Sequence, residues 1–214
     1  MPRRWVVERR RDFYYRKAKE LNYRSRAAFK LKQIDQRFRI LRRGATVVDL
    51  GAAPGGWLQV AKESVGSEGI VVGVDLQPIL PIEGVTTIRG DIRSEKTVEK
   101  VLSVIGGRAD VVLSDMSPNI SGNYSTDHAR SVELCEHALE FAKKSLKDGG
   151  SMVVKIFQGD LLKDYLRRVR KSFLDVKLHS PKASRPTSSE IYVIARGFVR
   201  NDKKEEDVDN SINQ

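Results

Sequence analysis

The sequence predicts an α/β fold with a seven-stranded, mostly parallel sheet, helices on both faces and an antiparallel last strand. Short apolar runs alternate with segments of helical periodicity from residue 45 onward, an order typical of parallel strands joined by crossover helices. Only a loop containing Pro and Ser separates the last two apolar runs. Because that loop is too short for a crossover helix, these two strands should run antiparallel to each other.

The apolar runs have the length and Val/Ile content of buried strands. They occupy residues 45–51, 69–76, 84–91, 109–116, 151–157, 173–179 and 190–197. Helices are expected at 55–65, 94–105, 126–146 and 160–172. The sequence DGG at 148–150 should end the third of these helices, because Gly favours helix termination.

A further helix is expected at residues 24–41, ahead of the sheet. Its apolar residues recur at steps of four and three and form one stripe: Ala27, Leu31, Ile34, Phe38 and Leu41. Lys30 lies about 60° from the centre of this stripe, at the boundary between core and solvent. Phe29 lies well off the stripe, which predicts an exposed aromatic side chain.

Positive charge is concentrated at the N-terminal end of the chain. The 214 residues carry a net charge of +11, but residues 1–43 alone carry +12 and the remainder −1. Aromatic residues are interleaved with the basic ones, a mixture suited to phosphate contacts and base stacking. We therefore expect residues 1–43 to be a helical RNA-binding segment packed on a main domain at 44–200. The alternative is a solvated basic arm; residues 201–214 should be a disordered polar tail.

Composition also narrows the class of protein. No apolar run approaches the roughly 20 residues of a membrane helix, and no signal-peptide pattern is present, so a cytoplasmic protein is expected. One cysteine and three scattered histidines predict no metal site. A monomer is expected.

The stretch VVDLGAAPGGW at residues 47–57 joins the first strand of the sheet to a helix. In open parallel sheets, ligands bind beyond the carboxyl ends of the strands, and glycines let a ligand approach the backbone. The turn matches neither the dinucleotide fingerprint nor a P-loop. A tight structural turn without a ligand is the alternative.

Acidic residues stand at or near the carboxyl ends of the first four predicted strands: Asp49, Asp75, Asp91 and Asp115. Such a rim repels phosphates but favours a cationic nucleoside, and S-adenosylmethionine is one. Asp75 stands about 20 positions past the glycine turn, where a ribose contact is expected, and Trp57 could pack beside the ligand. Each Asp alone could instead be a helix cap or turn residue.

Several segments together carry a resemblance to a known family: YRSRAAFKL, VVDLGAAPGGW, VVGVDL, GD at 90–91, VVLSDMSPNISG, VVKIFQG and SSEIYVIARG. They span residues 23–197, and the chain resembles the FtsJ family of RNA 2′-O-ribose methyltransferases. Within that family it is most similar to the group acting on large-subunit (23S-type) ribosomal RNA. The resemblance implies a class I, Rossmann-like methyltransferase sheet.

The resemblance also implies a function and site residues. The expected reaction is S-adenosylmethionine-dependent methylation of a ribose 2′-hydroxyl, on a uridine of ribosomal RNA. Cofactor contacts are implied at Gly55, Trp57, Asp75, Asp91 and Asp115. A catalytic Lys-Asp-Lys-Glu tetrad is implied at Lys30, Asp115, Lys155 and Glu190, with Lys155 as proton acceptor.

The chemistry leaves two roles open for Lys155. A hydroxyl is a poor nucleophile, so a base or a positioning cation is needed. As a base Lys155 must be neutral, which burial and Lys30 favour and which Asp115 and Glu190 oppose. Two other functions also remain open: a transfer-RNA ribose methyltransferase of the same family, and a catalytically silent RNA-binding protein.

Overall fold

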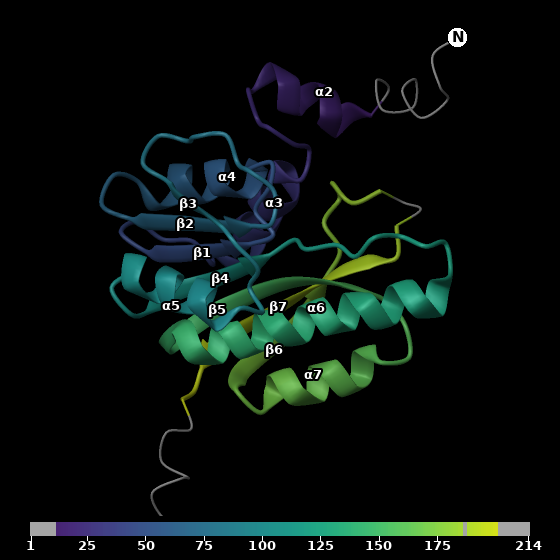
Figure 1. Ribbon diagram of the computed structural model, residues 1–214. Helices are drawn as coiled ribbons and strands as arrows, with labels where there is room; N and C mark the ends of the chain where they lie inside the picture. Colours follow the sequence, from purple (N-terminus) through teal and green to yellow (C-terminus); the bar gives the residue numbers. More distant parts are fainter. Residues whose placement is uncertain (1–11, 186–187, 201–214) are drawn as a thin grey trace, which may run out of the picture.

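The computed structural model describes residues 12–185 and 188–200 of the chain. Its seven strands form one sheet in the order β3-β2-β1-β4-β5-β7-β6 (Figure 1). They are β1 (Thr46–Leu50), β2 (Ile70–Asp75), β3 (Thr86–Arg89), β4 (Ala109–Ser114), β5 (Leu146–Phe157), β6 (Phe173–His179) and β7 (Glu190–Phe198). β7 is antiparallel to both of its neighbours, and the remaining pairs are parallel. The predicted fold class is confirmed.

Helices cover both faces of this sheet (Figure 1). One face packs against α5 (Glu95–Val104), α6 (Tyr124–Ser145) and α7 (Leu162–Arg170). The other packs against α3 (Ala28–Phe38) and α4 (Gly56–Val65), and α2 (Phe13–Glu20) adds its buried Ala18 to that side. Because β1, β2, β4 and β5 are parallel, their carboxyl ends meet along a single edge of the sheet.

Helix α3 is shorter than the predicted segment 24–41. The backbone N–H of Arg24 donates to the side chain of Gln59 (2.8 Å), so this residue is tied to α4. At the other end Arg39 adopts a left-handed conformation (φ 51°), which stops the helix. The N–H of Leu41 then donates to the Asp35 carboxylate at 2.7 Å.

The expectation that Phe29 is exposed is wrong. This residue is buried, because the chain preceding α3 folds back over it. Its ring packs edge-on against Tyr23 (centroids 5.7 Å apart) and against Tyr14 of α2 (5.5 Å). The spacing of apolar residues predicts one buried face for this helix, whereas α2 buries a second face of α3.

Strand β5 begins earlier than expected, directly after α6. Leu146 pairs with Ala109, and regular pairing resumes only at Ser151 opposite Val111. Residues 147–150, which contain the predicted DGG break, therefore bulge out between these two pairs. The carboxyl end of the strand, at Lys155 to Phe157, is unaffected because its pairing with β7 is regular there.

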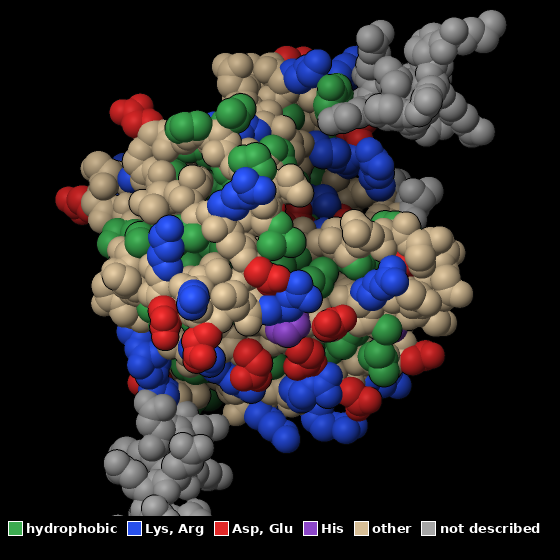
Figure 2. All heavy atoms as spheres, in the orientation of Figure 1, with side chains coloured by type: hydrophobic (Ala, Val, Ile, Leu, Met, Phe, Trp, Pro, Cys, Tyr) green, Lys and Arg blue, Asp and Glu red, His purple; other side chains and the backbone are tan. Residues whose placement is uncertain are grey.

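The distribution of charge varies over the face of the molecule shown in Figure 2. Figure 2 shows acidic and basic side chains intermingled over α5, α6 and α7, whereas Lys and Arg side chains gather near α2. Among the described residues, no helix combines the length and apolarity needed to cross a membrane. The predicted tail at 201–214 lies outside the described residues.

Candidate active site

A cavity of about 410 Å³ opens at the carboxyl edge of the sheet. Its lining comes from the ends of β2, β3 and β4 and from the glycine turn after β1, and includes Gly51, Ala53, Asp75, Asp91, Asp115 and His137. Apolar side chains of Val74, Ile92 and Met116 complete it. The cavity therefore combines apolar surface with three carboxylates and one guanidinium, that of Arg93, so its lining is net negative and suits a cationic nucleoside.

Asp75 ties the end of β2 to the glycine turn. Its Oδ2 accepts a hydrogen bond from the Ala53 N–H (2.9 Å), and its Oδ1 accepts one from the Gln77 N–H (2.7 Å). Each carboxylate oxygen can accept a second hydrogen bond. The side chain is thus held in place while capacity remains for a ligand hydroxyl.

Asp91 enters the same cavity from the end of β3. Its carboxylate pairs with Arg93 (Nη2 to Oδ2, 2.6 Å), and the hydrogen bonds from Arg93 lower the pKa of Asp91. Asp91 is therefore ionised at neutral pH.

The glycine turn needs Gly51 for a steric reason. Gly51 has φ +72°, and a Cβ there would approach Met116 Cγ to 2.3 Å. Any side chain would consequently displace Met116, whose side chain lines the cavity.

Asp49 lies behind the cavity instead of lining it. It is 1% exposed, and neither carboxylate oxygen has a hydrogen-bond partner among the described residues. Burial, together with the charges of Asp115 and Asp75, raises its pKa well above the usual range. Of the four rim carboxylates predicted from the sequence, three therefore line the cavity and Asp49 supports it from below.

Gly55 and Trp57 are not among the residues that line this cavity. A Cβ at Gly55 would come within 3.1 Å of Arg24, so the turn is closely packed there. Trp57 is buried; its Nε1 donates to the Ala27 carbonyl (2.8 Å) and its ring packs on Tyr192 (5.8 Å). Trp57 thereby holds the start of α3 against β7.

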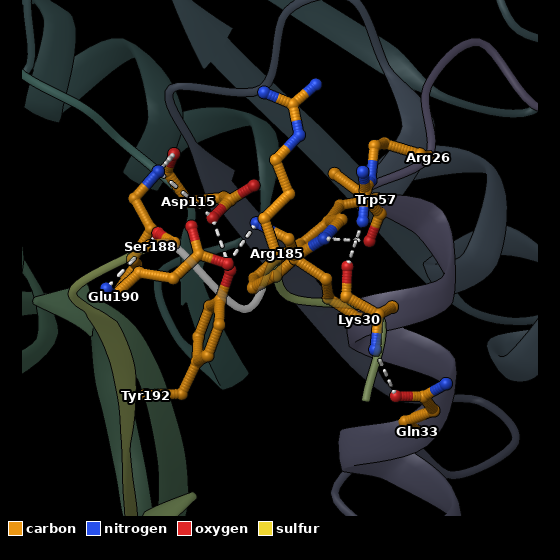
Figure 3. A network of polar contacts seen from close by, with 12 residues as sticks. Arg26, Lys30, Gln33, Trp57, Asp115, Arg185, Ser188, Glu190 and Tyr192 are labelled. Atoms are coloured by element: carbon orange, nitrogen blue, oxygen red, sulfur yellow. Dashed lines mark hydrogen bonds and ion pairs between the residues drawn. The ribbon is translucent and has the colours of Figure 1, made fainter. Parts of the chain in front are cut away.

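Three residues of the predicted tetrad, Lys30, Asp115 and Glu190, lie close together in Figure 3, and Lys155 contacts Asp115. Lys155 Nζ, only 7% exposed, lies 2.8 Å from the carbonyl oxygen of Asp115 and 3.2 Å from its Oδ1. Lys30 Nζ, from α3, lies 2.6 Å from Glu190 Oε1, a close ion pair. Asp115 belongs to both the tetrad and the cavity lining, so the cavity adjoins Lys155 directly.

Two ionisable groups of the tetrad region have clearly shifted pKa values. Burial opposes ionisation of Glu190, but the charges of Lys30 and Lys155 outweigh it and lower the pKa. Burial raises the pKa of Tyr192 well above its usual value, and the charges of Asp115 and Glu190 act in the same direction. Glu190 is thus an anion and Tyr192 a neutral hydrogen-bond donor.

Tyr192 belongs to the site although sequence reasoning did not select it. Its hydroxyl donates to Asp115 Oδ1 at 2.7 Å, and it is the β7 residue opposite Lys155. The two-residue period of a strand places Tyr192 on the same face as Glu190. That period was the available signal, since Glu190 was already a candidate.

Two arginines complete the surroundings of the tetrad (Figure 3). Arg26 forms an ion pair with Asp12 and donates to the Ala183 carbonyl (2.5 Å). Burial lowers the pKa of Arg26, and the nearby charge of Arg185 adds to this effect. The two guanidinium groups share the Asp12 carboxylate, and Glu190, which also acts on Arg26, is itself paired with Lys30, so positive charge is in excess on this side of the tetrad.

A second, basic hollow of about 560 Å³ lies on this side of the tetrad, at the mouth of the site. Its lining includes Tyr15, Lys19, Tyr23, Arg24, Arg26 and Arg185. Within residues 12–185 and 188–200, no group of three or more His, Cys, Asp and Glu side chains is placed to hold a metal ion.

Comparisons with known proteins agree with this architecture. A family model described as FtsJ-like methyltransferase matches residues 23–198. The ribosomal RNA large subunit methyltransferase E of Methanosarcina barkeri is 60% identical over 191 residues, covering 89% of this chain and 72% of that protein.

Two solved structures are similar in fold. A Plasmodium falciparum protein provisionally assigned as a ribosomal RNA methyltransferase has a TM-score of 0.75 at 28% identity, covering 83% of this chain and 100% of that one. Fibrillarin of Aeropyrum pernix, solved with natively bound S-adenosyl-L-methionine, has a TM-score of 0.58 at 17% identity. It covers 79% of this chain and 73% of that one, and the likeness concerns the fold alone.

Proposed function

The chain belongs to the FtsJ-like methyltransferase family, and from that premise we propose that it methylates a ribose 2′-hydroxyl of RNA with S-adenosylmethionine as methyl donor. The observation that carries the proposal is the position of Asp115. This residue lines the nucleoside-sized cavity and also contacts Lys155. A methyl donor in the cavity and a hydroxyl at Lys155 would therefore be neighbours.

The residues of the cavity fit S-adenosylmethionine. Asp75 has acceptor capacity for the ribose hydroxyls, and Asp91 and Asp115 supply negative charge for the cationic parts of the ligand. Val74, Ile92 and Met116 offer apolar contacts for the adenine ring. When bound, this cofactor supplies an electrophilic methyl group. We assign Gly55 and Trp57 to the cofactor site as residues that shape it, since neither lines the cavity.

Lys155 is proposed as the proton acceptor. A neutral amine has two N–H donors and one lone pair, whereas an ammonium has three donors. The two oxygens of Asp115 near Nζ match two donors, which leaves the lone pair for the substrate hydroxyl. Nζ of Lys155 would take the proton of the 2′-hydroxyl while the oxygen bonds to the methyl carbon and the carbon–sulfur bond breaks, its electron pair remaining on the thioether sulfur.

The other three tetrad residues position Lys155 and the substrate. Asp115 anchors the amine through two contacts, and Tyr192 fixes the Asp115 carboxylate. The Lys30–Glu190 ion pair places a cation and an anion near Lys155. Lys30 is thereby available to hold the ribose, while Glu190 keeps Lys30 from swinging into solvent.

RNA is the proposed substrate because the mouth of the site is basic and aromatic. The hollow lined by Tyr15, Lys19, Arg24, Arg26 and Arg185 includes residues of the segment directly before α3, the helix that carries Lys30. Phosphate contacts from Lys and Arg supply affinity, and aromatic rings supply stacking for bases. We extend this surface to the whole basic segment 1–43; its residues 1–11 lie outside the described part of the chain.

Large-subunit ribosomal RNA is the substrate we propose, with uridine as the methylated nucleoside. The first support is the 60% identity to a protein named for that substrate; the uridine rests on the family resemblance. We also propose a monomeric, cytoplasmic enzyme that encounters this RNA during ribosome assembly. A transfer-RNA ribose methyltransferase would present a similar active site, so only the substrate separates the two.

Mapping of ribose methylation after deletion of the gene tests the proposal. Ribosomal and transfer RNA from deleted and parental cells should be compared for resistance to alkaline cleavage, which 2′-O-methylation confers. The expected result is loss of methylation at one position of large-subunit RNA, restored by the intact gene and not by a Lys155→Ala variant. Loss in transfer RNA alone would instead identify the alternative substrate.

A further inference from the structure

A third cavity, of about 300 Å³, adjoins the tetrad. Its lining includes Ile120, Tyr124, His128, Phe157, Ser188 and Ser189. Phe157 is two residues beyond Lys155 on β5 and pairs with Glu190 across the strands. The N–H of Gln158 then donates to the Ser189 carbonyl (2.9 Å), which closes this end of the cavity. The cavity is therefore next to the proposed proton acceptor.

Tyr124 presents an aromatic ring at this cavity. The side chain is 61% exposed, yet its hydroxyl donates to the Gln158 carbonyl at 2.6 Å, which fixes the ring. One face of the ring stacks on His128, with centroids 6.4 Å apart and an interplanar angle of 16°. Because the residue remains largely exposed, the opposite face is accessible.

The support beneath Tyr124 is rigid. His128 is buried, and its Nε2 accepts a hydrogen bond from the Leu161 N–H (3.1 Å). Gly159 packs so closely on this imidazole that a Cβ there would lie 2.5 Å from it. An exposed ring with an immobilised hydroxyl and a fixed aromatic neighbour loses little conformational entropy when a ligand stacks on it.

The loop on the other side of the cavity is also fixed. The Asp127 carboxylate accepts hydrogen bonds from the Ser121 N–H (2.8 Å) and hydroxyl (2.8 Å) and from the Gly122 N–H (3.1 Å). This loop holds Ile120, which is 64% exposed, at the edge of the cavity. No Lys or Arg is among the lining residues, which contrasts with the basic hollow at the mouth.

We propose that this cavity holds the base of the nucleotide being methylated, stacked on the free face of Tyr124. The inference rests on the proposed function, since it requires a ribose at Lys155. The lining has no cation, and its one carboxylate, that of Asp127, accepts hydrogen bonds from Ser121 and Gly122. Such a lining with an accessible aromatic ring suits a neutral planar group better than a phosphate. Enzymes and proteins that act on unpaired RNA bases hold them by stacking of this kind. Tyr124 is then a substrate-binding residue for the target nucleotide, while the basic hollow binds the backbone.

Steady-state methylation of large-subunit RNA from the deletion strain tests the role of Tyr124. Tyr124→Ala removes the ring, Tyr124→Phe keeps the ring without its hydroxyl, and Tyr124→Trp enlarges the platform. Leu174→Ala, at an 82% exposed position on β6, is a matched control for loss of an exposed apolar side chain. We expect Tyr124→Ala to lower kcat/KM for RNA roughly 5- to 100-fold, the range for loss of one base–aromatic stack. Tyr124→Phe and Tyr124→Trp should stay near wild type, and all variants should bind cofactor normally and melt normally.

Ultraviolet crosslinking adds a readout that a purely structural role would not produce. The peptide containing Tyr124 should crosslink to the nucleotide that carries the methyl group in the product. A crosslink to a different nucleotide, or unchanged kcat/KM in Tyr124→Ala, would overturn the inference while leaving the proposed function intact. Equal losses in Tyr124→Phe and Tyr124→Ala would also overturn it, because the hydroxyl and not the ring would then matter. A wild-type protein inactive on every RNA would overturn the proposed function itself, and this inference with it.

Discussion

Tyr192 donates a hydrogen bond of 2.7 Å to Asp115 Oδ1, the oxygen that also lies 3.2 Å from Lys155 Nζ. Because burial and neighbouring carboxylates raise the pKa of Tyr192 well above its usual value, it remains a donor throughout the neutral range. Tyr192 therefore fixes the carboxylate that in turn fixes the lysine. It acts on the reaction through Asp115 and so is a positioning residue.

Replacement of Tyr192 by Phe should keep the shape of the site and lose this hydrogen bond. Hydrogen bonds to charged groups contribute about 1.5–3 kcal/mol, so we expect turnover to fall roughly 10- to 100-fold. Tyr165→Phe is a matched control, since its buried hydroxyl donates to the Cys135 carbonyl at 3.2 Å on the opposite face of the sheet. Equal turnover of Tyr192→Phe and wild type would show that Asp115 needs no such support.

The position of Tyr192 illustrates what sequence reasoning could and could not supply. The alternation of strands and helices, the antiparallel last strand and the acidic rim follow from periodicity, from the short last connection and from the rule that parallel strands end at one edge. The resemblance added the tetrad positions. Tyr192 was missed because its importance depends on pairing with Lys155 across two strands, a register that the sequence does not display.

Packing between segments that are distant in the sequence explains two further features that the sequence did not reveal. Phe29 was expected to be exposed because nothing in the sequence shows that α2 folds over α3. The sequence also did not reveal that the Trp57 indole donates to Ala27 and packs on Tyr192. Both residues are buried by segments that are distant in the sequence or that belong to another layer of the fold. Helical or strand periodicity carries no information on such contacts.

Replacement of Asp75 by Ala should weaken cofactor binding. The change removes an acceptor for ribose hydroxyls and also frees the Ala53 N–H in the glycine turn. Loss of one hydrogen bond to a charged group predicts a roughly 10-fold or greater rise in Kd. Calorimetric titration with S-adenosylmethionine measures this, and Asp164→Ala, at an exposed position on α7, is the control. Unchanged affinity in Asp75→Ala would indicate that the cofactor does not bind in this cavity.

Deletion of residues 1–11 should weaken RNA binding without affecting the sheet. The deleted segment holds five arginines and one glutamate, whereas α2 and the packing on Phe29 are retained. Fewer phosphate contacts release fewer counterions, so the salt dependence of the RNA affinity should become shallower. Fluorescence anisotropy at several salt concentrations gives both quantities. An unchanged slope would mean that these arginines do not contact phosphate.

Asp49 predicts a pH-dependent change in stability. In the folded protein its pKa is raised by burial and by the charges of Asp115 and Asp75, whereas in the unfolded chain it is about 3.9. Above about pH 4 the unfolded chain has released a proton that the folded protein retains, so stability falls as pH rises through this window. The Asp49→Asn variant lacks this titratable carboxyl group and therefore its contribution to the pH dependence of stability.

The Asp49→Asn variant should accordingly melt at a higher temperature than wild type near pH 7. This difference in melting temperature should shrink as the pH falls to about 4 and below, where Asp49 is protonated in both the folded and the unfolded wild-type protein. Thermal unfolding followed by circular dichroism across this range measures it, with Asp164→Asn as an exposed control. A difference independent of pH would contradict the buried, proton-binding state of Asp49.

The most direct measurement is single-turnover methyl transfer by Lys155 variants on the mapped RNA substrate. If Lys155 accepts the 2′-hydroxyl proton, Lys155→Ala should lower the rate by roughly 10²–10⁴, the usual range for a positioned acid–base group. Lys155→Arg should fail as well, because arginine does not release its proton near neutral pH. Affinities for cofactor and RNA should stay near wild type, and Lys147→Ala, which removes a surface ion pair on the same strand, should be active. An active Lys155→Arg would contradict the proton-acceptor role, and an active Lys155→Ala would contradict any catalytic role for Lys155.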